Sequence, residues 1–207
     1  MYYEAGKMGE NRTQKTLGYY KKNAENFTNS TQKIDFSKTQ ETFLKYLPGK
    51  AKILDFGCGV GRDTKYFSEK GYKVDATDGS PEMCRIASEY TGIPVRQMYF
   101  EELSSIEEYD GIWACSSILH LPKDELTDVI RKMIFALKSN GTIYTSFKYG
   151  NFEGERGERY FTDFTEKTFV QYLEQFPGLR LKEYWVTADV RPGREDEKWL
   201  NVILKKG

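Results

Sequence analysis

The chain has 207 residues and a mass of 24.1 kDa, which is the size of one α/β domain with modest additions. Lys and Arg together number 31, as do Asp and Glu, and the pI is about 6.6. This balance excludes a global basic field that would draw in nucleic acid or an anionic membrane, so we expect a small-molecule partner.

In chain order, residues 1–48 are expected to form a helical cap or lid, with the first 13 or so residues flexible. Residues 49–207 are expected to form the main domain. Apolar runs predict strands at 51–57, 72–78, 94–100, 111–117 and 142–150. Amphipathic spacing with start and stop signals predicts helices at 62–71, 80–92, 122–141 and 166–176.

Repeated strand and helix units predict a doubly wound, Rossmann-like α/β fold with helices on both faces. Residues 179–206 contain two strands around the turn "RPGRED", so the sheet is expected to have seven strands, mostly parallel, and to end in an antiparallel hairpin. Ligands bind such sheets at the carboxyl ends of the strands. The polar, glycine-punctuated insertion at 150–166 is therefore expected on the substrate side.

Three cysteines, Cys58, Cys84 and Cys115, lie far apart without a C-x-x-C pair, which argues against a disulfide framework and a zinc site. No apolar run reaches the roughly 18 residues of a membrane span, and the amino terminus has no hydrophobic signal core. The sequence therefore predicts a cytoplasmic protein with reduced thiols and no metal. It leaves the oligomeric state open.

The stretch "ILDFGCGVGRDT" contains Gly57, Gly59 and Gly61 in a G-x-G-x-G pattern. A dinucleotide site is typically formed by G-x-G-x-x-G. The preceding Asp55 would also place a carboxylate beside a pyrophosphate, which is unfavourable. Both features disfavour a nicotinamide oxidoreductase. S-adenosylmethionine (SAM) has an ammonium group and a sulfonium but no phosphate. Asp78, at the end of the next strand, is placed to accept both ribose hydroxyls of such a ligand.

Four ordered motifs carry a family resemblance: "LDFGCGVGRD", "ATDGSPEMCRIA", "YDGIWACSSILHLP" and "LKSNGTIYTSFKYG". Together they resemble the class I SAM-dependent methyltransferases over roughly residues 17–207. The segments "ERGERYFTDFTE" and "DVRPGREDEKWLNVILKK" resemble a bacterial subgroup labelled simply methyltransferase or tellurite-resistance-like. The resemblance implies a methyltransferase that uses SAM and releases S-adenosylhomocysteine.

The family pattern also implies which residues contact the cofactor. It assigns the methionine moiety to Asp55, Gly57, Gly59 and Gly61, the ribose to Asp78, the adenine to Gly79 and Met83, and the methyl end to Ala114 and Cys115. Many relatives place an Asp after the third strand to bind the adenine amino group, where this chain has Tyr99. Glu101 is the candidate substitute, with Phe100 beside it. Arg62 either contacts the cofactor carboxylate or is a surface charge.

His120, the only histidine, follows the fourth strand near the expected acceptor position. Its ordinary pKa of about 6.5 suits a general base, although helix capping or packing would explain it equally. The other candidate acceptor contacts are Tyr20, Lys148, Tyr149, Arg159 and Tyr160. Arg156 is placed among solvated loop charges. Trp113, Cys58 and Cys84 are expected to pack in the interior.

Methyl transfer from a sulfonium is an in-line displacement, in which the protein mainly aligns the acceptor and excludes water. The fourth strand ends in "ACSS", not in the Asn/Asp-Pro-Pro-aromatic motif of base amine methylation, and no Pro-Cys motif is present. These absences favour a small-molecule acceptor. A protein or RNA methyltransferase that needs a partner, and a SAM-binding protein without enzymatic activity, are the alternatives.

Overall fold

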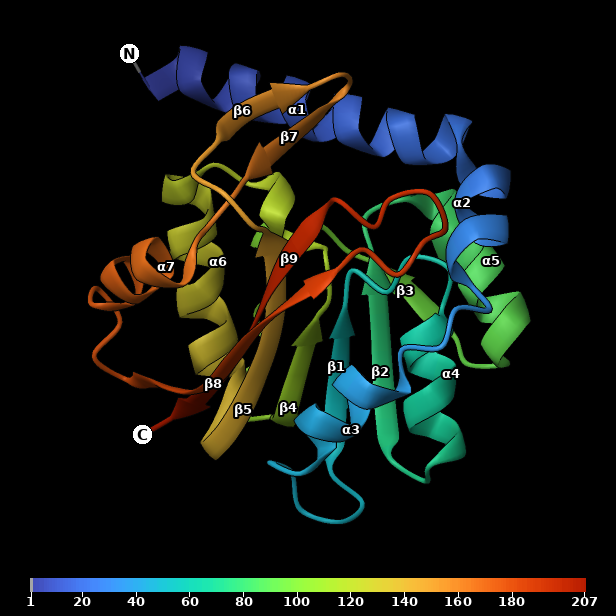
Figure 1. Cartoon of the computed structure of the whole chain (residues 1–207), viewed down its shortest axis with the longest axis vertical. Coiled ribbons are helices and arrows are strands. Elements are labelled where there is room, and N and C mark those ends of the chain that lie inside the picture. The colour runs from blue at the N-terminus through green and yellow to red at the C-terminus, as the bar shows by residue number, and fades with distance from the viewer. Residues whose placement is uncertain (1) are drawn as a thin grey trace.

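A seven-stranded sheet in the order β3-β2-β1-β4-β5-β9-β8 forms the centre of the computed structural model (Figure 1). The model describes the backbone of residues 2–207 and the side chains of residues 12–207. The strands of the sheet are β1 (Lys52–Phe56), β2 (Lys73–Asp78), β3 (Val95–Gln97), β4 (Tyr109–Ala114), β5 (Leu137–Lys148), β8 (Leu179–Ala188) and β9 (Lys198–Lys206). The strands from β3 to β5 are parallel, and β9 runs antiparallel to β5 and β8. The predicted sheet and its terminal hairpin are confirmed.

Helices cover both faces of the sheet because alternate residues of its strands are apolar on each side. Leu54 and Phe56 belong to the larger core cluster, while Ile53 belongs to a second cluster on the other face. The larger cluster packs under α6 (Lys123–Ala136) and α7 (Glu166–Leu173), and the second packs under α3 (Ser37–Leu44) and α4 (Arg62–Glu69). Helix α5 (Pro81–Thr91) lies against β3. Trp113 is fully buried in the second cluster, which confirms its predicted packing role.

Helices α1 (Tyr2–Lys22) and α2 (Ala24–Thr31) lie across the carboxyl end of the sheet, with α1 beside a small hairpin (Figure 1). Arg12 forms an ion pair with Glu125 at 2.9 Å, and Lys22 forms one with Glu158 at 2.9 Å. The amino-terminal region is therefore helical and covers the edge where ligands of such sheets bind. The boundary of the cap at residue 48 and the flexibility of the first 13 or so residues stay predictions.

Two local elements differ from the sequence-based expectation. Helix α6 ends at Ala136, and Leu137 is already extended and paired with Tyr109, whereas the predicted helix ran to Asn140 and Gly141. Sheet pairing overrides the helical pattern there, since the backbone N–H groups of Glu107 and Glu108 bond to the last carbonyls of the helix. The insertion at 150–166 contains a two-stranded hairpin, β6 (Glu153–Arg156) and β7 (Arg159–Thr162), which the polar composition did not predict.

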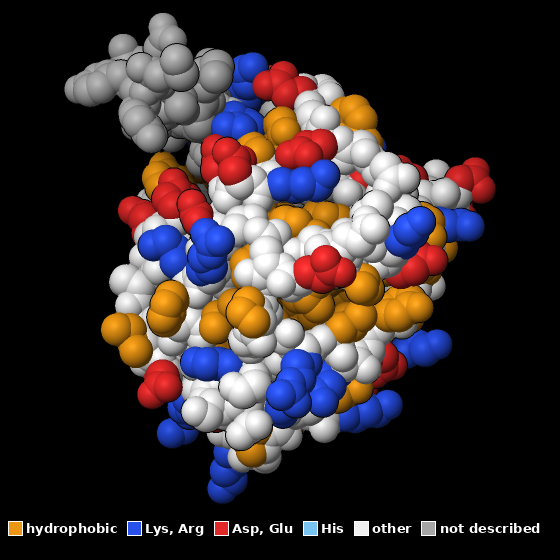
Figure 2. Space-filling view, turned by 90° about the vertical axis from the view of Figure 1, so that its left-hand side faces the viewer, with side chains coloured by type: hydrophobic (Ala, Val, Ile, Leu, Met, Phe, Trp, Pro, Cys, Tyr) orange, Lys and Arg blue, Asp and Glu red, His pale blue; other side chains and the backbone are white. Residues whose placement is uncertain are grey.

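Lys, Arg, Asp and Glu side chains are interspersed over the face drawn in Figure 2, with apolar side chains between them. This mixture agrees with the zero formal net charge of the chain. None of the helices that the structure describes is long and apolar enough to cross a membrane.

Candidate functional site

A cavity of about 220 Å³ lies at the carboxyl ends of the parallel strands, beneath α1 and α2. It is far larger than a single water molecule requires. Its wall comes from the segments after β1, β2, β3 and β4, from the carboxyl end of β5, from the β6-β7 hairpin (Glu153–Arg156 and Arg159–Thr162), from the two lid helices and from the loop between β8 and β9. The predicted site residues that line it are Tyr20, Gly57, Gly59, Arg62, Asp78, Gly79, Met83, Phe100, Glu101, Cys115, His120, Lys148 and Arg159.

The glycine loop after β1 turns tightly around the end of β2. The backbone N–H groups of Gly57 and Cys58 both donate to the carbonyl of Thr77 at 2.9 Å. Gly57 has a φ of +83°, and a Cβ there would lie 2.5 Å from the Cβ of Ser117. Only glycine satisfies both conditions, so the loop backbone itself forms this wall of the cavity.

Asp78 is held in a fixed orientation at the end of β2. One carboxylate oxygen accepts from the backbone N–H of Gly59 at 2.9 Å and the other from that of Ser80 at 2.8 Å. Burial raises the pKa of this carboxyl, and the two backbone donors partly offset the shift. Two carboxylate oxygens have about four acceptor sites, so two remain for a ligand in the cavity. A diol is the group that fits them.

Asp55 does not line the cavity, although its role was predicted there. It is 2% exposed behind the glycine loop, where it accepts from the hydroxyl of Thr64 at 2.5 Å. Burial and the neighbouring Asp63 raise its pKa to about 8. The sequence placed Asp55 correctly next to the loop, but the side chain points to the opposite face of β1 from Phe56.

Four other predicted site residues also lie outside the cavity wall. A Cβ at Gly61 would lie 2.8 Å from Thr91, because this glycine brings α4 close to α5. Ala114 is fully buried in the core. The hydroxyl of Tyr149 donates to Glu166 at the surface, and Tyr160 contributes only its backbone carbonyl near the site. The predicted roles of these side chains are therefore not supported by direct exposure to the cavity.

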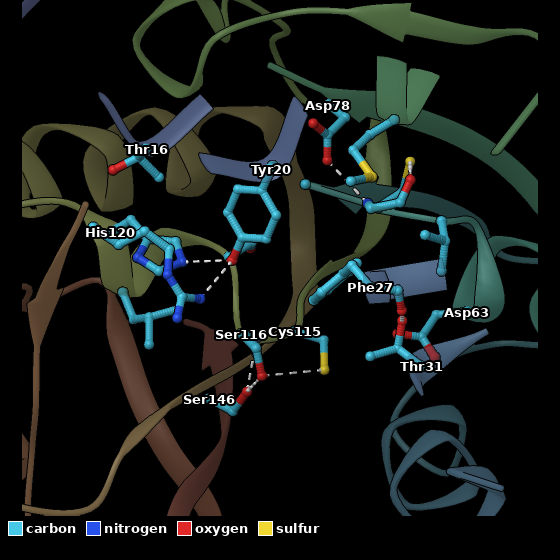
Figure 3. Close-up of a pocket in the computed structure, with 18 of the residues that line it drawn as sticks. Thr16, Tyr20, Phe27, Thr31, Asp63, Asp78, Cys115, Ser116, His120 and Ser146 are labelled. Carbon is cyan, nitrogen blue, oxygen red and sulfur yellow. Dashed lines mark hydrogen bonds between the residues drawn. The ribbon is translucent and has the colours of Figure 1, made fainter. Parts of the chain in front are cut away.

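His120 and Tyr20 point toward one another across the cavity (Figure 3). The Nδ1 atom of His120 lies 2.7 Å from the carbonyl of Tyr160, so Nδ1 carries the proton and donates. Its Nε2 atom then accepts from the hydroxyl of Tyr20 at 2.9 Å. Burial lowers the pKa of His120 to about 4. The ring is neutral, and its acceptor lone pair is already engaged by Tyr20 of the lid helix.

Arg62 forms a two-pronged ion pair with its neighbour Asp63, at 2.8 and 2.9 Å. Its guanidinium carbon lies 4.3 Å from the centre of the Phe36 ring. Asp63 also accepts from Gln40 and Trp113, which fixes the pair in the wall. Arg62 is thus not a solvated surface charge, and its predicted contact with a ligand carboxylate stays a prediction.

Sequence reasoning missed two parts of the wall. Thr13, Thr16 and Leu17 line the cavity on the same face of α1 as the predicted Tyr20, and their helical spacing is the signal that would have indicated them. The hydroxyl of Thr16 is buried and has no hydrogen-bond partner among the described residues. The second missed part is the loop after β8, whose lining residues are Asp189, Val190, Arg191 and Arg194.

Within residues 12–207, no group of three His, Cys, Asp or Glu side chains has an arrangement that would hold a metal ion.

Residues 53–141 match the family model of a methyltransferase domain. The whole fold aligns with the crystal structure of 1,6-didemethyltoxoflavin-N1-methyltransferase from Burkholderia thailandensis with a TM-score of 0.77 at 20% identity, covering 97% of this chain and 89% of that one. The matched segment and the shared fold agree with the resemblance to the class I methyltransferase superfamily. The resemblance carried by the four motifs is confirmed.

Two further relatives of this superfamily are informative. An uncharacterized methyltransferase of Staphylococcus carnosus is 28% identical over 106 residues, which are 48% of this chain and 51% of that protein. A TehB-like SAM-dependent methyltransferase of Corynebacterium glutamicum has a TM-score of 0.65 at 21% identity, covering 93% and 98% of the two chains. The chain spans about half the length of the curated relatives it matches.

Class I methyltransferases use SAM, and the structure of the Burkholderia enzyme contains S-adenosylhomocysteine. The cavity suits such a ligand at one end. Asp78 has two acceptor sites left for the ribose, the Gly57 loop lets a ligand approach the backbone closely, and Met83 and Phe100 give apolar surface for a base. The residues present therefore fit the cofactor of the superfamily.

Proposed function

We propose that this protein is a SAM-dependent methyltransferase that acts on a small-molecule acceptor. The observation that supports it best is the cavity itself. It has the carboxylate and glycine loop of a nucleoside site at one end, and it continues under the lid to His120, Lys148 and Arg159 at the other. A helical lid over the acceptor end of the cavity favours a small acceptor.

When bound, SAM supplies an electrophilic methyl group on sulfur. Asp78 would accept the two ribose hydroxyls, and the wall around Met83, Tyr99 and Phe100 would hold the adenine, with Glu101 near its rim. The lid helix excludes water, and the opposite wall orients the acceptor, so the chain contributes alignment more than acid or base chemistry.

His120 contributes little as a base in this arrangement. A proton could reach its Nε2 atom only in place of the Tyr20 hydroxyl, and its lowered pKa of about 4 makes it a weak acceptor at neutral pH. We therefore propose that the acceptor reaches the site with a nucleophile that needs no deprotonation there. In this view His120 and Tyr20 hold the lid and shape the wall.

The similar Burkholderia enzyme, whose crystal structure contains 1,6-didemethyltoxoflavin, supports a small acceptor. A protein or RNA acceptor and a SAM-binding protein without activity are the competing functions. Both are separated from our proposal by the experiment below.

Calorimetric titration with SAM, S-adenosylhomocysteine and NAD tests the cofactor. We expect the first two to bind and NAD not to bind. Asp78→Asn should weaken S-adenosylhomocysteine binding by about tenfold or more, because the charged acceptor of two hydroxyls is lost and the amide oxygen can accept from only one of the two backbone N–H groups.

Asp75→Asn on the same strand is the matched control, since Asp75 bonds to Tyr109 and does not line the cavity. Binding of NAD alone, or equal S-adenosylhomocysteine affinity in wild type and Asp78→Asn, would contradict the assignment. Mass spectrometry of small compounds incubated with protein and SAM then tests transfer. Cofactor binding with methylation only of protein or RNA, or with no transfer to any acceptor, would favour the competing functions.

A further inference from the structure

The two ends of the cavity carry opposite charge. Around the glycine loop, Asp78 and Glu101 add two carboxylates to the wall, while Arg62 and Asp63 neutralise each other. The far end lies at the carboxyl end of β5, on β7 and in the loop between β8 and β9. Its cationic wall residues are Lys148, Arg159, Arg191 and Arg194.

The carboxylates around these four cations do not neutralise all of their charge. Arg191 pairs with Asp189 at 2.5 Å, and Arg194 shares Glu197 with Lys148. Within residues 12–207, Arg159 forms no ion pair at all. Four positive charges against two negative ones leave an excess of two at this end of the cavity.

Arg159 is held in place by aromatic rings. Its guanidinium carbon lies 4.1 Å from the ring centre of Tyr19 and 5.0 Å from that of Phe161. Lys148 lies 4.8 Å from the ring centre of Trp199. Arg159 donates one N–H to the Tyr20 hydroxyl at 3.5 Å, and Lys148 pairs with Glu197, while stacking on the rings leaves the other N–H donors of Arg159 available for a further partner. Arg156 differs, because Asp163 neutralises it directly at 2.5 Å.

Burial and the neighbouring cations together lower the pKa values of two members of this group. Burial and the neighbouring Arg194 and Arg191 lower the pKa of Lys148 to about 8. Burial and Arg191 also lower the pKa of Arg194, with a further contribution from Arg159. Like charges that repel one another in a ligand cavity are stabilised when an anion binds among them.

We infer that the methyl acceptor carries a carboxylate, which binds at this end of the cavity between Arg159 and the loop that holds Arg191 and Arg194. The planar fork of arginine matches a carboxylate with two parallel hydrogen bonds. The rings of Phe161 and Trp199 beside the cations favour an organic acid over a small inorganic ion. That the bound carboxylate belongs to a methyl acceptor rests on the proposed function, but binding of an anion at this end can be tested without methyl transfer.

The test uses benzoate and benzamide, two flat probes of nearly equal shape that differ in charge. Calorimetric titration into the full protein saturated with S-adenosylhomocysteine should give at least tenfold tighter binding of benzoate. Arg159→Gln and Arg194→Gln should each weaken benzoate about tenfold or more and leave S-adenosylhomocysteine affinity within twofold. Arg180→Gln, on the exposed side of β8 outside the cavity, is the matched control and should change neither.

Equal affinity for benzoate and benzamide would overturn the inference, as would benzoate affinity within twofold of wild type in both cavity variants. An equal loss in Arg180→Gln would assign the effect to overall charge and also overturn it. Tighter binding of inorganic phosphate than of benzoate would overturn the choice of a carboxylate. The titrations are repeated without S-adenosylhomocysteine. Failure of S-adenosylhomocysteine to bind would refute the proposed function, whereas the difference in affinity between benzoate and benzamide would still decide whether the anion site exists.

Discussion

At the scale of single residues, the wall of the cavity tolerates no side chain at position 57. Gly57 combines a φ of +83° with a Cβ position 2.5 Å from Ser117. Gly71 has nearly the same φ, +84°, but nothing lies within 4 Å of its Cβ position. Substitution of the two glycines therefore compares the cost of backbone strain alone, at Gly71, with the cost of strain plus steric overlap, at Gly57.

We predict that Gly71→Ala lowers the free energy of unfolding by about 1 kcal/mol, because the only cost is the strain of a side chain on a left-handed backbone. Gly57→Ala should cost about 2 to 4 kcal/mol in total, since overpacking adds to the same strain. It should also weaken S-adenosylhomocysteine binding, because Ser117 and Phe100 must move. Urea unfolding of both variants measures the difference. Equal losses would show that the neighbours of Gly57 yield without cost.

At the scale of elements, α1 covers the cavity, and Tyr20 joins it to His120 through a hydrogen bond. The hydroxyl of Tyr20 bonds to His120, whereas the hydroxyl of Tyr19 has no hydrogen bond to any residue of the described side chains. Tyr20→Phe leaves a buried acceptor on His120 without a donor, which costs about 1 to 3 kcal/mol.

We expect this cost to destabilise the state in which α1 is packed over the cavity, relative to the state in which it has opened. Amide hydrogen exchange of residues 12–22 should accelerate by about fivefold or more in Tyr20→Phe, because helix opening becomes cheaper. Tyr19→Phe is the control and should keep the exchange rates of wild type, since its ring still stacks under Arg159. Unchanged exchange in both variants would mean that the bond to His120 does not hold the lid.

At the scale of the whole molecule, buried ionisable groups set how stability varies with pH. Burial and Asp63 raise the pKa of Asp55 from 3.8 to about 8, and burial lowers that of His120 from 6.5 to about 4. Between pH 4 and 6.5 the folded chain holds an extra proton on Asp55 and lacks one on His120, so the two effects oppose each other. From pH 6.5 to 8 His120 is neutral in both states, and the extra proton on Asp55 is the main difference, which the lowered pKa of Lys148, about 8, begins to oppose only toward pH 8.

Stability should therefore fall as pH rises from 6.5 to 8, by at most about 1.4 kcal/mol per pH unit, because the folded state must release a proton that the unfolded state has already lost. Asp55→Asn should remove this slope, since the amide keeps the acceptor for Thr64 without titrating. Urea unfolding at intervals across this range provides the measurement. Parallel pH profiles of wild type and variant would assign the slope to other groups.

Local patterns were enough to predict the fold and one end of the cavity. The alternation of apolar strands with amphipathic helices predicted the doubly wound sheet, and the glycine loop and Asp78 lie within one βαβ unit, where a few residues of sequence fix their positions. The same patterns failed at Ala136, where a helix gives way to a sheet pairing with Tyr109 that no local signal encodes.

The sequence by itself determined the class of the fold, the strand ends at which the cavity lies, and the glycine loop and Asp78 in its wall. The sequence named Tyr20 and Arg159 as acceptor contacts, but only the tertiary structure brought Arg194 to them, because the three come from segments more than 30 residues apart that meet through packing of the lid, the β6-β7 hairpin and the β8-β9 loop. It also decided that Asp55 lies behind the wall and that His120 is neutral, since strand alternation and burial, not residue type, set the direction of one side chain and the pKa of the other.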